Sequence, residues 1–180
     1  MADEMDGLDF PPEHDVPIPY RHRIGTYYQA LGYGKPYRWA QYTHVPFTPL
    51  KKPLKDSRVA LVTTAAPYQP DKGDQGPGAP YNAAAKFYKV YTQSIEGEPD
   101  VRISHIGIDR KHTTAEDINT WFPLKQLKRL EKEGRFKELA PEFIGAPTNR
   151  SQKVTIEQDC VDVLAHVRRL GADVAVIAAN

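Results

Sequence analysis

The sequence has little of what would define a secreted, membrane-spanning or nucleic-acid-binding protein. Its 180 residues include a single cysteine, Cys160, which excludes an intrachain disulfide and a thiolate metal cage. No run approaches the roughly 18 apolar residues that a membrane span needs. The 24 basic and 23 acidic side chains nearly cancel to a net charge of +1, so neither nucleic acid nor an anionic membrane is favoured as a partner. These absences predict a soluble protein of a reducing compartment, with the cytoplasm as the default.

The amino-terminal residues also lack any Lys or Arg. Residues 1–15 instead carry Asp3, Glu4, Asp6, Asp9, Glu13 and Asp15. This is the reverse of the basic start of a signal peptide, so export by that route is not expected. Prolines follow closely, and we predict that residues 1–20 are an acidic flexible tail, with a partner-docking arm as the alternative.

Residues 21–55 combine a short helical pattern with a proline-rich and aromatic segment. Apolar side chains recur at helical spacing from Arg21 to Leu31, and Gly32 follows as a stop. Between Gly32 and Pro53 the chain interleaves prolines and glycines with aromatic residues (Tyr33, Tyr37, Trp39, Tyr42, Phe47). We therefore predict a short helix followed by an extended arm that packs on the domain or on a second subunit.

The apolar runs that follow have the character of strands. Val59–Ala66 (VALVTTAA) is nearly continuously apolar, which predicts a strand of a parallel sheet buried on both faces. Val101–Ile108 and Asp173–Ala179 are predicted as further strands. Tyr81–Ser94 stays open between helix and strand, because its alanines favour one and its Tyr, Val and Thr residues the other.

Two stretches have the periodicity of amphipathic helices. Pro123 suits the first turn of one helix, which Gly134 ends. The other runs from about Val154 to Leu170, with Gly171 where a left-handed cap residue belongs. The apolar stripe of this second helix, which includes Cys160 as a buried and inert thiol, is predicted to face the core (Ile156, Cys160, Val161, Leu164, Val167).

This rhythm of strands and helices predicts an α/β domain over residues 56–180. Its sheet should be parallel, flavodoxin-like or doubly wound, and incomplete after the last strand. Ligands of such sheets bind outside the carboxyl ends of the strands. Three segments would meet there: the turn at Thr63–Ala66, the turn at Gly107–Asp109, and whatever follows Asn180. The long loop from Pro67 to Pro80 is expected to be either functional or mobile.

The densest group of polar residues runs from Asp109 to Asn119 (DRKHTTAEDIN). Its imidazole and carboxylate groups, with His105, could serve as metal ligands or as an acid and base, but their spacing matches no metal motif, so we assign no metal. Turn and capping roles, or the ordering of a substrate loop, are the alternatives. Asp117 and Asn119 stand where entry into a helix would be capped. Motifs of serine hydrolases, zinc proteases and nucleotide-binding loops are absent from the sequence.

Four segments of the sequence carry a family resemblance. The run RVALVTTAA follows the proline-rich VPFTPLKKPLKDS; next comes SHIGIDRKHTTAEDINTWFPLKQLKRLEKEGRFKELAPEFIGA; and a helix leads into GADVAVIAAN. Together, over Val45–Asn180, they resemble the B-component selenoproteins of the glycine, sarcosine and betaine reductases and the small selenoprotein subunit of D-proline reductase. The most specific piece is Asp117-Ile118-Asn119 followed by Phe122-Pro123-Leu124. The segment Tyr33–Trp39 is similar to a less characterised branch.

The resemblance implies a chemistry and a set of partners. In that family the last strand ends in a selenocysteine or cysteine that cleaves a C–N bond reductively and is regenerated by a thioredoxin-type dithiol. The nucleophile would then follow Asn180. A UGA codon read as stop, a processing site, or a short or shortened protein would each account for this ending. No cofactor is expected in this chain, although a pyruvoyl group on a partner subunit or fragment would hold the substrate.

We therefore interpret the chain as part of a reductase subunit that acts on an amino acid or amine. It should work in an oligomeric complex with other subunits or with the carboxyl-terminal remainder of the same protein, and be inactive alone. A non-catalytic binding or assembly subunit is the alternative. The residues predicted to line or support the site are Thr63, Thr64, Asp109, Asp117, Asn119 and Asn180.

Overall fold

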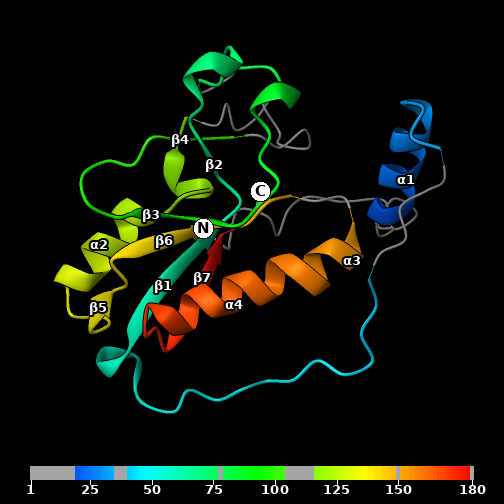
Figure 1. Cartoon of the computed structure of the whole chain (residues 1–180). Helices are drawn as coiled ribbons and strands as arrows, with labels where there is room; N and C mark the ends of the chain where they lie inside the picture. Colours follow the sequence, from blue (N-terminus) through cyan, green and yellow to red (C-terminus); the bar gives the residue numbers. More distant parts are fainter. Residues whose placement is uncertain (1–18, 35–39, 77–78, 104–115, 149–150, 179–180) are drawn as a thin grey trace, which may run out of the picture. The chain divides into compact units, whose positions relative to one another are not determined.

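The computed structural model describes residues 19–34, 40–76, 79–103, 116–148 and 151–178 (Figure 1). The chain divides into two units, Met1–Val45 and Pro46–Asn180. In the first, α1 (Tyr20–Ala30) confirms the predicted helix, and Gly32 just beyond it has a φ of 81°. The predicted tail over residues 1–20 lies almost entirely outside the described residues, and the boundaries 1–20, 21–55 and 56–180 stay predictions.

The second unit begins with an exposed stretch of the arm. Phe47 is 92% exposed and Leu50 is 53% exposed, so this part of the arm does not pack on the domain. A proline-rich backbone that lacks ladder hydrogen bonds has little to hold it against a surface. Packing on a second subunit, the other half of that prediction, stays a prediction.

The sheet is centred on β1 (Arg58–Thr63), which has a partner along each of its edges. Val62 is in register with Ile144 of β6 (Glu142–Gly145) and with Ile177 of β7 (Val174–Ala178), and both pairings are parallel. The short β5 (Glu138–Leu139) continues the β6 side, parallel to the start of β1. Outside β6 lies β3 (Tyr91–Ser94), which is antiparallel. The result is a mixed, mostly parallel sheet.

Both faces of β1 are buried, as its apolar run predicted. Val59 and Leu61 belong to one core cluster, and Ala60 and Val62 belong to the other. The first cluster includes Leu124 and other residues of α2 (Leu124–Lys132), whereas the second includes residues of α4 (Cys160–Arg169). The two helices therefore cover opposite faces of the sheet, which confirms an α/β fold.

The order of the strands follows from these connections. From β1 the chain passes through α2 to β5 and β6 on one side, and then through α4 to β7 on the other side (Figure 1). Across the sheet the parallel strands lie in the order β6, β1, β7. In chain order these are the second, first and third parallel strands, which is the order at the start of a flavodoxin-like sheet. A change of direction at β1 requires the helices to change faces, because parallel crossovers are right-handed.

The strand predicted at Val101–Ile108 does not join this sheet in its described part. β4 (Val101–Arg102) instead pairs antiparallel with β2 (Ala66–Pro67) in a separate two-stranded sheet. The alternation of Val101 with the half-exposed Arg102 suits such a half-buried ladder, whereas a central parallel strand is apolar throughout. The place that the prediction gave to this strand belongs to β6.

Of the predicted core stripe of the last helix, Val167 packs on the core as expected, whereas the other members are exposed. The helix begins as α3 (Gln152–Val154) and passes through a π-helical turn, Thr155–Asp159, into α4. A π turn contains one extra residue, so it shifts the phase of α4 relative to α3. Val163 and Val167 face the sheet, whereas Cys160 is exposed and not a buried thiol. The other members of the predicted stripe that are exposed are Ile156, Val161 and Leu164.

β7 confirms the strand predicted at Asp173–Ala179, and among the described strands it pairs with β1 alone. Its residues alternate between half-buried and exposed, and Ile177 is 71% exposed. The sequence pattern correctly predicted that β7 is apolar, but apolar character alone does not say whether another strand lies beside it.

Short helical turns complete the described elements. They are η2 (Leu54–Asp56), η3 (Pro70–Lys72), η4 (Ala83–Ala85) and η5 (Ile118–Thr120). The segment Tyr81–Ser94, left open by its sequence, contains both η4 and β3. Gly134 and Gly171 have φ values of 70° and 63°, which confirms the predicted ends of the two helices.

Candidate functional site

The carboxyl ends of β1, β6 and β7 meet at one edge of the sheet. The backbone N–H of Ala146 donates to the carbonyl of Thr63 over 2.7 Å, and that of Thr64 donates to the carbonyl of Ala178 over 3.3 Å. The order of strands reverses at β1, so the gap between β1 and β7 is the topological switch point of the sheet. Open α/β sheets bind ligands beside this point.

Thr63 supports this edge from inside the protein. It is fully buried, and its Oγ1 donates to the carbonyl oxygen of Trp121 over 2.8 Å. The same oxygen accepts a hydrogen bond from the N–H of Ala65 over 3.1 Å. Thr63 therefore fixes the turn after β1 and joins it to the loop before α2, while Thr64 next to it is half-buried.

Asp117 and Asn119 lie together in the loop that Thr63 holds. Asp117 caps η5, because its Oδ1 accepts from the backbone N–H of Asn119 over 3.0 Å and from its Nδ2 over 2.9 Å. Asp117 thus caps this short turn, whereas the predicted cap of the helix itself was wrong, because α2 begins after Pro123 without a side-chain cap. Three of the predicted site residues are thus connected through one short segment, whereas Asp109 and Asn180 lie outside the described residues.

Trp121 belongs to the same segment but escaped the sequence analysis. Its side chain is only 5% exposed, and its Nε1 is buried with no hydrogen-bond partner among the described residues. The Oδ1 of Asn119 is in the same state within the part of the chain that the structure describes. Buried polar atoms usually have partners, so these two are exceptions within the described part of the chain. The sequence signal that could have indicated Trp121 is its position directly after the capping residues.

Tyr91 is a second residue that sequence reasoning missed. Its hydroxyl donates to the carbonyl of Ala65 over 2.8 Å, which ties β3 to the turn after β1. The ring makes edge-to-face contacts with Phe87 and Phe143. Burial raises the pKa of the Tyr91 hydroxyl, so it stays a neutral hydrogen-bond donor. Sequence reasoning missed this role of Tyr91 because the segment Tyr81–Ser94 could not be assigned to helix or strand.

The long loop after β2 is organised by one buried amide. Gln75, 7% exposed, donates from Nε2 to the carbonyls of Gln69 and Gly73, and its Oε1 accepts from the N–H of Gln69. Asn82 adds bonds from its Nδ2 to the carbonyls of Lys72 and Asp74. The described part of this loop is therefore built around specific side chains, which its glycines and prolines did not reveal.

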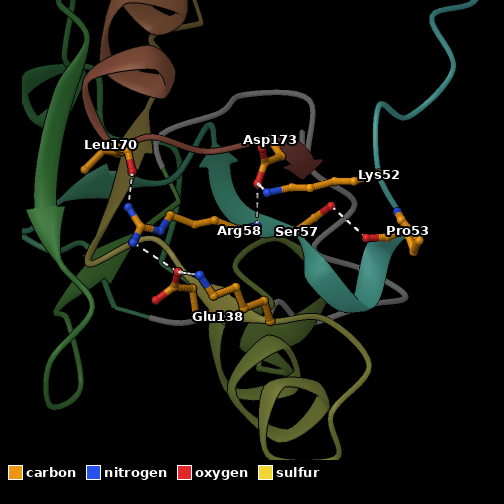
Figure 2. Close-up of polar contacts among 8 residues, drawn as sticks. Lys52, Pro53, Ser57, Arg58, Glu138, Leu170 and Asp173 are labelled. Atoms are coloured by element: carbon orange, nitrogen blue, oxygen red, sulfur yellow. Dashed lines mark hydrogen bonds and ion pairs between the residues drawn. The ribbon is translucent and has the colours of Figure 1, made fainter.

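The amino-terminal ends of the strands, opposite the switch point, are joined by a network of ion pairs and hydrogen bonds centred on Arg58 (Figure 2). Its guanidinium donates to the carbonyl of Leu170 over 2.9 Å and pairs with Glu138 at 3.0 Å. Its backbone N–H donates to Asp173, which also pairs with Lys52 at 2.7 Å. These contacts join the amino ends of β1, β5 and β7, and they stabilise the sheet at the end away from the switch point.

In its described part the switch-point edge offers hydrogen-bonding groups and no cysteine. Its described side chains are hydroxyls, an amide and the exposed carboxylate of Asp117. Among the described residues no three His, Cys, Asp or Glu side chains cluster as metal ligands; His105, Asp109 and His112 lie outside them. Within the described chain no helix is both long and apolar enough to cross a membrane. The arrangement can orient a polar ligand by hydrogen bonds.

The fold and this edge define an α/β domain whose candidate ligand site lies where the first and third parallel strands, β1 and β7, end. The chain is 32% identical over 135 residues to D-proline reductase subunit gamma of Acetoanaerobium sticklandii, a match that covers 74% of this chain and 53% of the relative. It belongs to the selenoprotein reductase family of that subunit, as its sequence motifs indicated. It spans about half the length of this curated relative. No family model and no solved structure matches the chain.

Proposed function

We propose that the chain is the part of a D-proline-reductase-type subunit that builds the substrate side of the catalytic site. The match to the gamma subunit over 74% of the chain carries this proposal. The substrate class is an amino acid or amine whose C–N bond is cleaved reductively. The other subunits of a reductase, or the remainder of the same subunit, are the partners.

The nucleophile, selenocysteine or cysteine, is proposed to follow Asn180 directly. Two observations on β7 support this position. The strand is parallel to β1 up to Ala178, and the carbonyl of Ala178 accepts from the N–H of Thr64 at the switch point. A residue placed shortly after Ala178 therefore emerges at the edge where ligands of such sheets bind.

The reaction balances without a metal ion. The selenolate or thiolate attacks the carbon that bears the amine, so a bond to carbon forms, the C–N bond breaks, and its electron pair leaves on nitrogen, which takes up a proton. A thiol then attacks the selenium or sulfur, and the carbon leaves with its electron pair and is protonated. A dithiol of the thioredoxin type supplies two electrons that reduce the resulting selenenyl sulfide or disulfide.

The residues of this chain would bind and orient the substrate. Thr63 holds the turn and the loop in place, and Thr64, Asp117 and Asn119 offer polar groups at the edge. Asp109 and Asn180 remain proposed members of the site. A pyruvoyl group would belong to a partner subunit or fragment, and no described residue is assigned to it.

The position of the nucleophile is tested by the gene and by activity. The codon after that of Asn180 should be UGA or a cysteine codon, and residues 1–180 alone should show no C–N reductive cleavage. A preparation of the complete complex, assayed with a dithiol and candidate amines including D-proline, is the positive control. Full activity from residues 1–180 would overturn the assignment.

A second candidate function is a non-catalytic binding or assembly subunit. It is favoured by the exposed apolar side chains of the arm, where Val45 is 78% and Phe47 92% exposed. Alkylation of the complete complex separates the two functions, provided that Cys160 is first replaced by serine, because its exposed thiol would react as well. Loss of turnover in the Cys160→Ser complex supports the catalytic role; unchanged turnover supports the assembly role.

A further inference from the structure

The face of the sheet that α4 covers extends beyond the reach of α4. Ala60 and Val62 of β1 belong to the cluster that contains Val163 and Val167 of α4. The register places Ile177 of β7 beside Val62, and neighbours in register project from the same face of a sheet. Ile177 is nevertheless 71% exposed. The helix therefore covers β1 on this face and leaves β7 bare.

One flank of α4 is exposed on the side of β7. Arg169 pairs with Glu142 of β6 at 2.6 Å, so its flank of the helix faces β6, across β1 from β7. Each helical residue turns about 100°, which puts Cys160 and Leu164 on the opposite flank. Cys160 is exposed, and Leu164 is 47% exposed. We call this flank and the bare face of β7 together the β7–α4 surface (Cys160, Leu164, Ala175, Ile177).

The geometry of the sheet says what would fit this surface. β7 consists of Val174–Ala178, apolar throughout, which is typical of a strand buried on both faces, yet Ala175 and Ile177 on one of its faces are exposed. Edge strands usually carry a charge or a proline that prevents further pairing. In a flavodoxin-like sheet the fourth strand lies outside the third. A right-handed crossover from β7 to such a fourth strand would run in the same direction as the crossover from β6 to β7. Its helix would therefore lie on the same face of the sheet as α4.

We propose that the β7–α4 surface binds a strand–helix unit from the part of the reductase subunit for which this chain has no counterpart. The strand pairs in parallel with the outer edge of β7, and an apolar helix packs beside α4 over Ile177 and Leu164. The match covers 53% of the relative, so the gamma subunit has nearly as much chain again to supply this unit. The proposal rests on membership of a longer reductase subunit, but it needs no turnover to be tested.

Cys160 is a built-in reporter because it is the single cysteine of the chain and is exposed on this surface. The probe is the part of the A. sticklandii gamma subunit outside the match, co-expressed with residues 1–180 and purified with them. The rate of maleimide addition is followed by mass spectrometry of the Cys160 peptide. We expect the partner to slow this addition at least tenfold. A cysteine introduced as Lys132→Cys on α2, in a Cys160→Ser background, should react at the same rate with and without the partner.

Substitutions on the surface complete the test. Leu164→Asp and Ile177→Asp replace exposed side chains, so the chain itself should fold, and each should abolish both co-purification and protection of Cys160. Tyr88→Asp, at a residue 64% exposed on another segment, should change neither. Failure of the two parts to co-purify, or co-purification without protection, overturns the proposal. Protection that grows with the concentration of residues 1–180 alone assigns the surface to a second copy and also overturns it. Each outcome is independent of C–N cleavage activity.

Discussion

The ring of Tyr91 lies directly over Gly145, its register partner on the neighbouring strand β6. A Cβ on residue 145 would overlap atoms of the ring, so only glycine leaves room for it. The hydroxyl at the far end of the ring reaches the carbonyl of Ala65 in the turn after β1. Because Gly145 has no side chain, the ring of Tyr91 can cross β6 and connect β3 to the turn after β1 at the switch-point edge.

Gly145→Ala should destabilise the protein through this contact alone. The φ of Gly145 lies outside the left-handed region, so alanine is acceptable to the backbone and the cost is steric. Overpacking of this kind costs about 1–3 kcal/mol, measured as the free energy of unfolding in urea. In a Tyr91→Ala background the ring is gone, and the same substitution should cost about 0.5 kcal/mol or less. An equal cost in both backgrounds would contradict the explanation.

Thr63→Val tests the link between β1 and the loop that carries Asp117. Valine has the shape of threonine but leaves the carbonyl of Trp121 and the N–H of Ala65 without their buried partner. The expected loss is about 1–3 kcal/mol of unfolding free energy. Amide hydrogen exchange in residues 117–122 should also become faster, because the loop is no longer held.

Thr63→Ser is the matched control for this substitution. Serine keeps the hydroxyl, so exchange in residues 117–122 should stay near the rate of the native protein, while the lost methyl costs about 1 kcal/mol. If both variants accelerate exchange equally, the hydroxyl is not what positions the loop.

The sequence could predict those parts of the fold that depend on local composition. The apolar run of β1, the glycines that end α2 and α4, and the cap of Asp117 on η5 each follow from neighbours within a few residues. The buried face of α4 could not be predicted from its apolar residues alone, because they lie on more than one face of the helix: Val163 and Val167 pack on the core, whereas Cys160, Val161 and Leu164 are exposed.

The site was predictable only in part for a related reason. Thr63 and Trp121 meet across 58 positions of sequence, and Tyr91 reaches Ala65 across 26. Contacts of this kind depend on which strands become neighbours, and β6 was absent from the predicted sheet. The residue types correctly indicated the carboxyl ends of the parallel strands, but tertiary packing determines which side chains meet there.

Acid should weaken the fold through its ion-paired carboxylates. Hydrogen bonding to Arg169 lowers the pKa of Glu142, and hydrogen bonding to Lys137 and Arg58 lowers that of Glu138. The pKa of Asp173 is lowered through Lys52. A carboxyl with a lowered pKa binds fewer protons folded than unfolded, so its stabilisation is complete above its unfolded pKa of about 4 and is lost below it.

Glu142→Gln should therefore reduce the dependence of stability on pH. Its free energy of unfolding should be lower than that of the native protein at pH 7, and the difference should shrink as the pH falls through about 4 towards 2. Glu96→Gln, outside these ion pairs, is the control and should leave the pH profile unchanged. A constant difference between Glu142→Gln and the native protein at every pH would show that the effect is one of packing and not of charge.

Gln75→Ala should loosen the loop between β2 and β3 while leaving the sheet intact. The substitution removes both bonds to Gln69 and the bond to the carbonyl of Gly73, at an expected cost of about 1–3 kcal/mol. Because these bonds are confined to the loop, limited proteolysis should cut residues 67–76 faster, while amide exchange in β1 should change little. Gln126→Ala, at an exposed residue of α2, should alter neither. Unchanged cleavage in the Gln75→Ala variant would mean that the glycines and prolines of the loop, and not this buried amide, set its conformation.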